Sequence, residues 1–184
     1  MQELGAALFD TPIGLCGIAW SADGLRGVQL PEAGVSAART RLARRFPVSV
    51  ESEPPGAVLE IIEAIREHLR GSATVYNEAM LDFAGIGPWE ASVYRAALAI
   101  RYGETRTYGA LAASLDAPGG AQAVGQALGR NPWPIVVPCH RILAADGRTG
   151  GFSAPGGAVT KLRLLEIEGA LAPETLPLFA GTIA

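Results

Sequence analysis

Residues 131–143 read NPWPIVVPCHRIL, and this stretch decides how the second half of the chain is expected to fold. Prolines bracket its apolar run, a pattern that predicts an extended and mostly buried strand. The strand would deliver Cys139 and His140 into a turn at its far end. Because the 184 residues include two cysteines and two histidines, one of each side by side raises the question of chemistry at this turn.

Neighbouring residues in a strand point to opposite faces, so Cys139 and His140 need not touch each other. Taken alone, the pair is a buried thiol beside a hydrogen-bonded core histidine. Three features favour a reactive pair. The pair lies at the end of a rigid buried strand, Arg141 follows it directly, and the glycine-rich segment 148–159 could form a loop that closes over a small ligand. A histidine oriented by a carboxylate would raise the thiolate fraction, and Glu166 or Glu168 could orient it.

Helical spacing of apolar residues is repeated around this stretch. It predicts helices over residues 88–100, 108–115, 121–130 and 160–171. The three helices before residue 131 are compatible with a helix-turn-helix, although most helix pairs of this kind bind no DNA.

The first half has a different pattern, with apolar runs separated by turn residues. It predicts antiparallel strands at residues 6–9, 14–20 and 25–30, helices at 37–46 and 57–69, and a strand-like segment at 80–85. The fold class is therefore α/β (α+β), with an antiparallel-sheet-plus-helix domain over residues 1–86 and a mostly helical domain over 87–184. We expect Cys16 to be a buried apolar residue and His68 to be a surface residue near a helix C-terminus.

Composition limits the possible functions. The net charge is −3, which argues mildly against a nucleic-acid partner, yet residues 88–170 carry eight cations against six anions. No uncharged apolar run approaches membrane-spanning length, and no basic segment followed by an apolar one opens the chain. We expect a cytoplasmic monomer with reduced thiols, no membrane contact, no metal and no cofactor.

On these residues the chain resembles the O6-alkylguanine-DNA alkyltransferase family, the methylated-DNA-protein-cysteine methyltransferases. The resemblance covers residues 88–170 strongly and the first half more loosely through residues 9–25. It rests on five blocks in the family's order and spacing: YGETRTYGALA, AVGQALGRNP, PCHRI, GGFSAPGG and KLRLLEIEGA.

The resemblance implies a stoichiometric DNA-repair reaction. Cys139 would accept the alkyl group of O6-alkylguanine, or of O4-alkylthymine as an alternative lesion, as a stable thioether, so that each molecule acts once. His140 would take the thiol proton through a water, and Glu168, which directly precedes a glycine as in the family, would orient the imidazole. Tyr108 would protonate the leaving oxygen, and Asn131 would tie the recognition helix to the active-site turn.

The resemblance also implies a guanine pocket and a DNA surface. Pocket residues would be Ile142, Phe152, Ser153 and Lys161. The partner would be double-stranded DNA, from which the alkylated nucleotide is flipped out. Helix 121–130 would enter the minor groove, and the DNA contacts would come from Gln122, Ala123, Gly125, Arg130 and Arg141.

The chain departs from the family at two of these positions. Gln122 stands where the family usually has an arginine that fills the gap left by the flipped base, which predicts weaker duplex binding or a changed substrate. Phe152 replaces a tyrosine and keeps its stacking face. The zinc ligands that some members carry in the first domain have no counterparts here.

Two other functions remain open from the sequence. One is an alkyltransferase-like protein that flips and flags lesions without repairing them, although members of that class typically lack the cysteine. The other is a Cys-His-Glu hydrolase or transferase acting on small molecules, which would turn over repeatedly.

Overall fold

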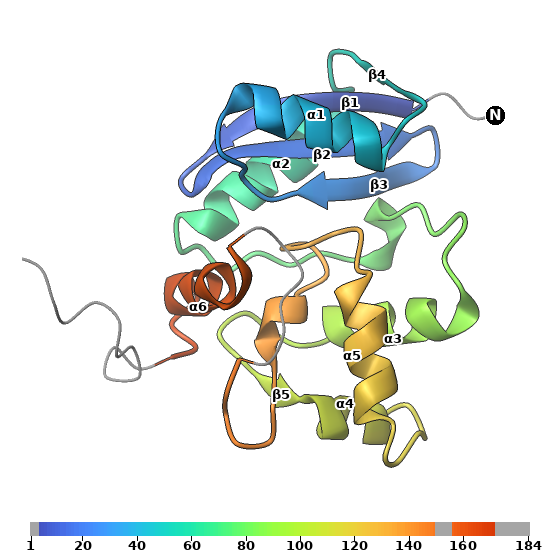
Figure 1. Cartoon of the computed structure of the whole chain (residues 1–184), viewed down its shortest axis with the longest axis vertical. Helices are drawn as coiled ribbons and strands as arrows, with labels where there is room; N and C mark the ends of the chain where they lie inside the picture. The colour runs from blue at the N-terminus through green and yellow to red at the C-terminus, as the bar shows by residue number, and fades with distance from the viewer. Residues whose placement is uncertain (1–3, 150–155, 172–184) are drawn as a thin grey trace, which may run out of the picture.

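A four-stranded sheet forms the first half of the protein in the computed structural model, which describes residues 4–149 and 156–171 (Figure 1). The strand order is β3-β2-β1-β4. The strands are β1 (Leu4–Thr11), β2 (Gly14–Ser21), β3 (Gly24–Gln29) and β4 (Ser49–Glu51). Strands β1, β2 and β3 are antiparallel as predicted, whereas β4, which the sequence pattern missed, pairs parallel to β1.

Helices cover the two faces of this sheet, with α1 (Val35–Arg45) in front and α2 (Gly56–Leu69) behind it in Figure 1. Alternate residues of a strand point to opposite faces, and the strands supply a different apolar set to each helix. Ala6 and Ala19 pack with Leu42 of α1. The other face belongs to the main core, which includes Cys16 and Ile18 with the buried residues of α2. The prediction that Cys16 is a buried apolar residue is confirmed.

The second half is mostly helical, as predicted. Its helices are α3 (Pro88–Leu98), α4 (Tyr108–Ala113), α5 (Ala121–Gly129) and α6 (Gly157–Ile167), with a short 3-10 turn η2 (Cys139–Arg141) and the two-residue strands β5 (Arg106–Thr107) and β6 (Ile142–Leu143). Pro88 occupies the first turn of α3, where its missing N–H costs nothing. Helix α5 packs against α3 and α4.

The predicted strand before Cys139 is wrong. None of residues 131–138 lies in a strand, and residues 134–136 form a turn, with Ile135 at a φ of 76° and Val137 N donating to Trp133 O at 2.8 Å. An apolar run between prolines specifies burial but not extension, and Ile135, Val136 and Val137 are all fully buried. The strand predicted at residues 80–85 is also absent, because η1 (Glu78–Met80) and a single bridge from Leu81 to Leu25 take its place.

Main-chain hydrogen bonds join the two halves beside this turn. Val28 N donates to Pro132 O at 2.9 Å, and the Trp133 indole Nε1 donates to Leu25 O at 2.7 Å. Arg45 of α1 adds contacts to the carbonyls of Asn131 and Pro132. The main core also contains residues of both halves, so the turn that carries Cys139 is fixed to β3.

Candidate active site

Cys139 begins η2, and 7% of its surface is exposed. Its backbone N donates to Val137 O at 2.8 Å, which holds the turn tight. Burial raises the pKa of the Cys139 thiol, while a hydrogen bond from Asn131 and the positive charge of Lys161 act to lower it. The sulfur therefore lies at the rim of the core, beside groups that stabilise a thiolate.

Asn131 links the end of α5 to this turn. Its side-chain Nδ2 donates to Val137 O at 2.9 Å, and its Oδ1 accepts from Trp133 N at 2.9 Å. Both contacts are buried, so the amide fixes the path of the chain between the helix and the thiol. The contacts agree with the tie that the resemblance implies for Asn131, whose role in the reaction stays a prediction.

Lys161 and Tyr108 form the other side of the thiol's surroundings. Lys161 is 1% exposed, and its Nζ donates to Ile142 O at 2.5 Å and to the Tyr108 hydroxyl at 3.5 Å. Lys161 is therefore not a solvated residue of the helix surface. Burial lowers the pKa of Lys161 from 10.5 to about 8, against the opposing effect of Cys139. Burial and the charge of Cys139 raise the pKa of Tyr108, so its hydroxyl keeps its proton at neutral pH.

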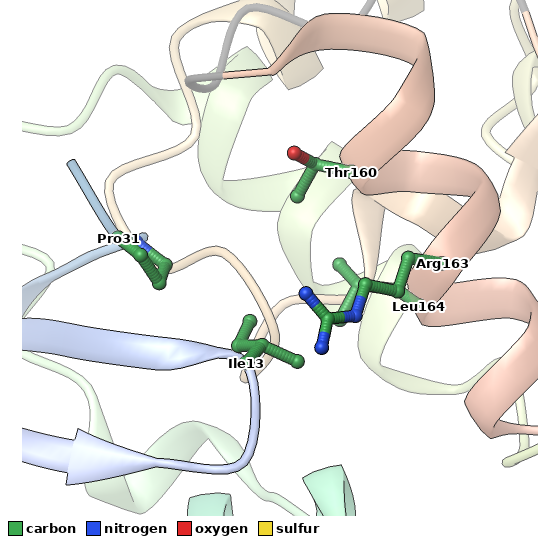
Figure 2. A pocket seen from close by; sticks show the side chains of 5 residues that line it. All are labelled: Ile13, Pro31, Thr160, Arg163 and Leu164. Carbon is green, nitrogen blue, oxygen red and sulfur yellow. The ribbon is translucent and has the colours of Figure 1, made fainter. Parts of the chain in front are cut away.

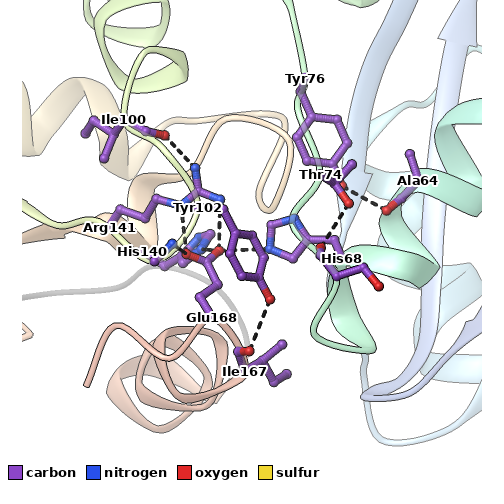
Figure 3. Close-up of polar contacts among 12 residues, drawn as sticks. Ala64, His68, Thr74, Tyr76, Ile100, Tyr102, His140, Arg141, Ile167 and Glu168 are labelled. Atoms are coloured by element: carbon purple, nitrogen blue, oxygen red, sulfur yellow. Dashed lines mark hydrogen bonds and ion pairs between the residues drawn. The ribbon is translucent and has the colours of Figure 1, made fainter. Parts of the chain in front are cut away.

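His140 and Glu168 are in direct contact in the buried centre of the second half (Figure 3). His140 Nε2 lies 2.6 Å from Glu168 Oε1, and both side chains are fully buried. Glu166, the other carboxylate considered, is exposed. Burial lowers the pKa of His140, and Glu168 only partly opposes this, so the imidazole is neutral at neutral pH.

The ionised state of Glu168 decides which nitrogen of His140 carries the proton. Burial would raise the pKa of the Glu168 carboxyl, but hydrogen bonds from His140, His68 and Arg141 outweigh it and lower the pKa. An ionised carboxylate only accepts hydrogen bonds, so His140 Nε2 carries the proton. Its Nδ1 is buried, has no hydrogen-bond partner among the described residues, and is left as a base.

His68 is not the surface residue that its sequence position indicated. It is fully buried, and its Nε2 lies 2.8 Å from Glu168 Oε1, the same oxygen that His140 contacts. Its place near the C-terminus of a helix does not show whether another part of the chain covers the side chain. Glu168, which lies 100 positions later in the chain, provides the partner.

Arg141 was predicted to contact DNA, and the structure contradicts this. Only 4% of its surface is exposed. Its Nε and Nη2 bind the two oxygens of Glu168 at 2.8 and 3.0 Å, and its Nη1 donates to Ile100 O at 2.6 Å. The guanidinium neutralises a buried carboxylate and is unavailable to a phosphate.

The other predicted DNA residues lie on or beside α5. Gln122 and Ala123 are exposed, and Gly125 is half-buried, where a Cβ would lie 3.8 Å from the Tyr108 ring. Arg130 is exposed and bonds to Glu90 at 2.6 Å. Exposure therefore leaves the first turn of α5 and Arg130 open to a partner, while Gly125 faces the candidate active site.

Two predicted pocket residues, Phe152 and Ser153, lie outside the described residues. Ile142 is fully buried in β6, and its carbonyl holds Lys161. A pocket of about 70 Å³ lies between the β1–β2 turn and α6, where Arg163 extends toward Ile13 (Figure 2). It is too small for a nucleobase, and Cys139 does not line it.

The only group among the described residues with the composition of a metal site is His68, His140 and Glu168, whose ligand atoms lie within 4.8 Å of one another. Arg141 already binds both carboxylate oxygens, and its fixed positive charge disfavours a cation there. The absence of a metal stays a prediction. None of the helices within the described parts of the chain is long and apolar enough to cross a membrane.

Comparisons with known proteins agree on one family. A family model described as "6-O-methylguanine DNA methyltransferase, DNA binding domain" matches residues 88–170. A methylated-DNA-protein-cysteine methyltransferase of Mycobacterium tuberculosis is 36% identical over 170 residues, which cover 92% of this chain and 95% of that protein. A "DNA base-flipping protein" of Thermus thermophilus is 38% identical over 68% of this chain and 82% of its own length.

A solved structure gives the same result. The crystal structure of Mycobacterium tuberculosis OGT in complex with DNA matches with a TM-score of 0.72 and 33% sequence identity. The match covers 90% of this chain and 93% of the OGT chain. The mixed α/β fold class is thereby confirmed.

Proposed function

The chain belongs to the methylated-DNA-protein-cysteine methyltransferase family, and we propose that it repairs DNA by moving the alkyl group of an O6-alkylguanine onto Sγ of Cys139. Repair by alkyl transfer to a cysteine is the function that the relatives support. The observation that supports Cys139 as the acceptor is its position at the rim of the core, beside Asn131 and Lys161.

Activation of the thiol begins with His140. Its Nε2–H is fixed on Glu168, so its unprotonated Nδ1 takes the Cys139 proton through a water. Glu168 acts as a positioning residue, since it touches the imidazole and not the reacting atoms. Its negative charge stabilises the imidazolium that forms. Lys161 stabilises the resulting thiolate.

The transfer itself is a displacement at the alkyl carbon. The Sγ–C bond forms as the C–O6 bond breaks, and the bonding pair leaves with the guanine. Tyr108 donates a proton to the leaving base, and Lys161, which lies 3.5 Å from its hydroxyl oxygen, stabilises the negative charge on that oxygen. In the net reaction the thiol proton replaces the alkyl group on guanine. The stable thioether on Cys139 prevents a second transfer by the same molecule.

Access to the lesion requires that the nucleotide leave the duplex. A base in the stack cannot reach a thiol at the rim of the core, so the nucleotide is flipped out at a cost of a few kcal/mol. We assign α4 and α5 as the helix-turn-helix, with Gln122 and Ala123 at the minor groove and Arg130 toward the phosphates. The exposure of these three residues supports the assignment. The family resemblance alone assigns Phe152 and Ser153, which lie outside the described residues, to the guanine pocket, and we place the reaction in the cytoplasm.

One experiment separates repair from the other functions. The protein is incubated with a duplex that contains O6-methylguanine, and its peptides are then weighed. Repair predicts one added methyl group on the peptide that contains Cys139, and Cys139→Ser abolishes it. Cys16→Ser is the matched control, because burial raises the pKa of the Cys16 thiol to about 11 and this variant keeps full transfer.

The other outcomes are equally distinct. Binding to the lesion with no change of mass identifies a base-flipping protein that does not repair, a function that the Thermus thermophilus relative keeps open. A protein that neither binds the lesion nor gains mass, and that turns over a small ester repeatedly, is a hydrolase.

A further inference from the structure

One side chain of the first half reaches the carboxylate that orients the candidate base. His68 lies in the last turn of α2, and its Nε2 is 2.8 Å from Glu168 Oε1. The same oxygen accepts from His140 Nε2 at 2.6 Å. Two imidazoles from the two halves of the chain therefore share one carboxylate oxygen, as Figure 3 shows.

We propose that His68 is a positioning residue for alkyl transfer, which fixes Glu168 and, through it, the imidazole of His140. The proposal rests on the function assigned above to Cys139 and His140. It gives the first half of the chain a direct part in the reaction, beyond the structural support that its sheet provides.

The hydrogen bonds around Glu168 leave its carboxylate a single orientation. Oε1 accepts from both imidazoles and from Arg141 Nη2 at 3.0 Å, and Oε2 accepts from Arg141 Nε at 2.8 Å and from Gly103 N at 3.3 Å. Since the carboxylate only accepts, His68 donates from a protonated Nε2. Without this donor, Glu168 would lose the one contact that approaches from the first half.

Aromatic neighbours fix the ring of His68. It stacks on Tyr76 with ring centroids 5.8 Å apart and an interplanar angle of 25°, and it meets Tyr102 edge-on at 5.1 Å. Each tyrosine is itself anchored, because Tyr76 donates to Ala64 O at 3.3 Å and Tyr102 donates to Ile167 O at 3.1 Å. The imidazole can therefore hold Glu168 in one place.

Packing alone does not explain a histidine at this position. Its Nδ1 is buried and has no hydrogen-bond partner in the described parts of the chain, and an unpaired buried polar atom is unfavourable. A phenyl ring would fill the same space without that cost. The contact with Glu168 is the feature that a phenyl ring could not supply.

The charges around His68 give a second, separable effect. The titratable groups that face it are Glu168, His140, Arg141, Tyr76 and Tyr102. The charge of His68 is among the causes that lower the pKa of His140. His68 thus keeps His140 able to accept the thiol proton at lower pH.

The test compares rate constants for methyl transfer from an O6-methylguanine duplex between pH 5 and 9. The proteins are wild type, His68→Phe, which removes the donor, and His68→Gln, which keeps an N–H at similar reach. Ile62→Ala is the control, since it removes only apolar atoms from the core face of the same helix.

His68→Phe is expected to slow transfer about tenfold at pH 8, the factor that one hydrogen bond to a charged group is worth. His68→Gln is expected to recover most of that rate. In both variants the fall in rate on acidification should begin at higher pH, because one of the causes that lower the pKa of His140 is removed. The control should lose stability and keep the wild-type rate and pH profile.

Three results would overturn the proposal. Wild-type rates and pH profiles in both variants would reduce His68 to a packing residue, while the proposed function would stand. Equal losses in His68→Gln and His68→Phe would show that the donor does not matter. A wild-type protein that transfers no methyl group would remove the proposed function, and this inference with it. Should His68→Phe fail to fold, the pH profile of His68→Gln alone decides.

Discussion

The ammonium group of Lys161 donates a 2.5 Å hydrogen bond to the carbonyl oxygen of Ile142 inside the core. Burial lowers the pKa of this lysine from 10.5 to about 8, so its charged form is less stable in the folded protein than in the unfolded chain. Below pH 8 the buried charge of Lys161 lowers the free energy of unfolding by its full amount, about 3 kcal/mol. This loss of stability is relieved as the pH rises from about 8 to 10.5, because the folded protein has then released a proton that the unfolded chain still holds.

Lys161→Met is therefore expected to stabilise the protein at pH 7 by about 2 kcal/mol, after subtraction of about 1 kcal/mol for the lost hydrogen bond. The advantage should shrink between pH 8 and pH 10. Methyl transfer should slow, because the thiolate of Cys139 loses its cation. Urea denaturation at pH 7 and pH 10 measures the first effect, and a variant that is less stable at both pH values would contradict it.

Asn131→Ala should both destabilise the turn and slow the reaction. The substitution leaves Trp133 N unpaired in the core and removes one of the two hydrogen bonds that Val137 O accepts, the other coming from Cys139 N, which together is expected to cost about 2–4 kcal/mol. The pKa of the Cys139 thiol should rise further, visible as slower alkylation by iodoacetamide near neutral pH. Asn77→Ala is the matched control, since Asn77 is exposed and its Oδ1 accepts one bond from Ala79 N. It should lose only about 1 kcal/mol, and equal losses in the two variants would contradict the prediction.

Acid should destabilise the protein through His140 and Glu168. The pKa of His140 is lowered by folding, so below about pH 6.5 the unfolded chain binds a proton that the folded protein resists, and stability falls. The pKa of Glu168 is also lowered, so its contribution is present above about pH 4.5 and is lost as the pH falls further. Thermal unfolding between pH 8 and pH 2 should show this decline in two overlapping stages.

Glu168→Gln should remove the second stage and lower stability at pH 7.5 by about 3–5 kcal/mol, because it leaves Arg141 buried without its counter-charge. Transfer should slow sharply as His140 loses its orientation. Glu166→Gln, two residues earlier and exposed, is the control and should match wild type in both measurements. Wild-type stability in Glu168→Gln would show that Arg141 finds another partner.

Gln122→Arg should strengthen binding to duplex DNA and speed transfer, because an arginine there can fill the gap left by the flipped base. The slope of log K against log salt should steepen by about 1. Gln126→Arg adds the same charge to another exposed position of α5 and is the control. It should strengthen binding in the same salt-dependent way without a faster transfer. A rate gain of equal size in both variants would reduce the effect to charge alone.

Local pattern was enough to predict most elements of this fold. Apolar runs between turn residues located β1 to β3, and helical spacing located every helix from α1 to α6, because each element buries the apolar residues that its own sequence displays. The turn at residues 134–136 was missed. Its apolar residues are as buried as those of a strand, and nothing in the run PIVV distinguishes the two conformations.

Side chains whose partners lie far away in sequence were the harder part of the site. The contact of His140 with Glu168 was predicted through the family's motif. The burial of Arg141 and of His68 was not, because both depend on the same carboxylate, which the fold alone brings to them. The sequence pattern instead favoured a surface position for both residues. Arg141 was interpreted as a DNA contact beside the reactive cysteine, and His68 as an exposed residue near the end of a helix.

The bonds that hold the thiol's turn to β3 use main-chain atoms of the strand, the amide of Val28 and the carbonyl of Leu25. Any residue offers that carbonyl and any residue except proline that amide, so these two bonds themselves require no particular side chain in β3. Packing is what restricts the strand, since Leu25 and Val28 are fully buried and a Cβ at Gly27 would lie 2.2 Å from the Phe46 ring. The first half thus holds the turn of the thiol through backbone atoms of its edge strand, whatever side chains that strand displays to solvent.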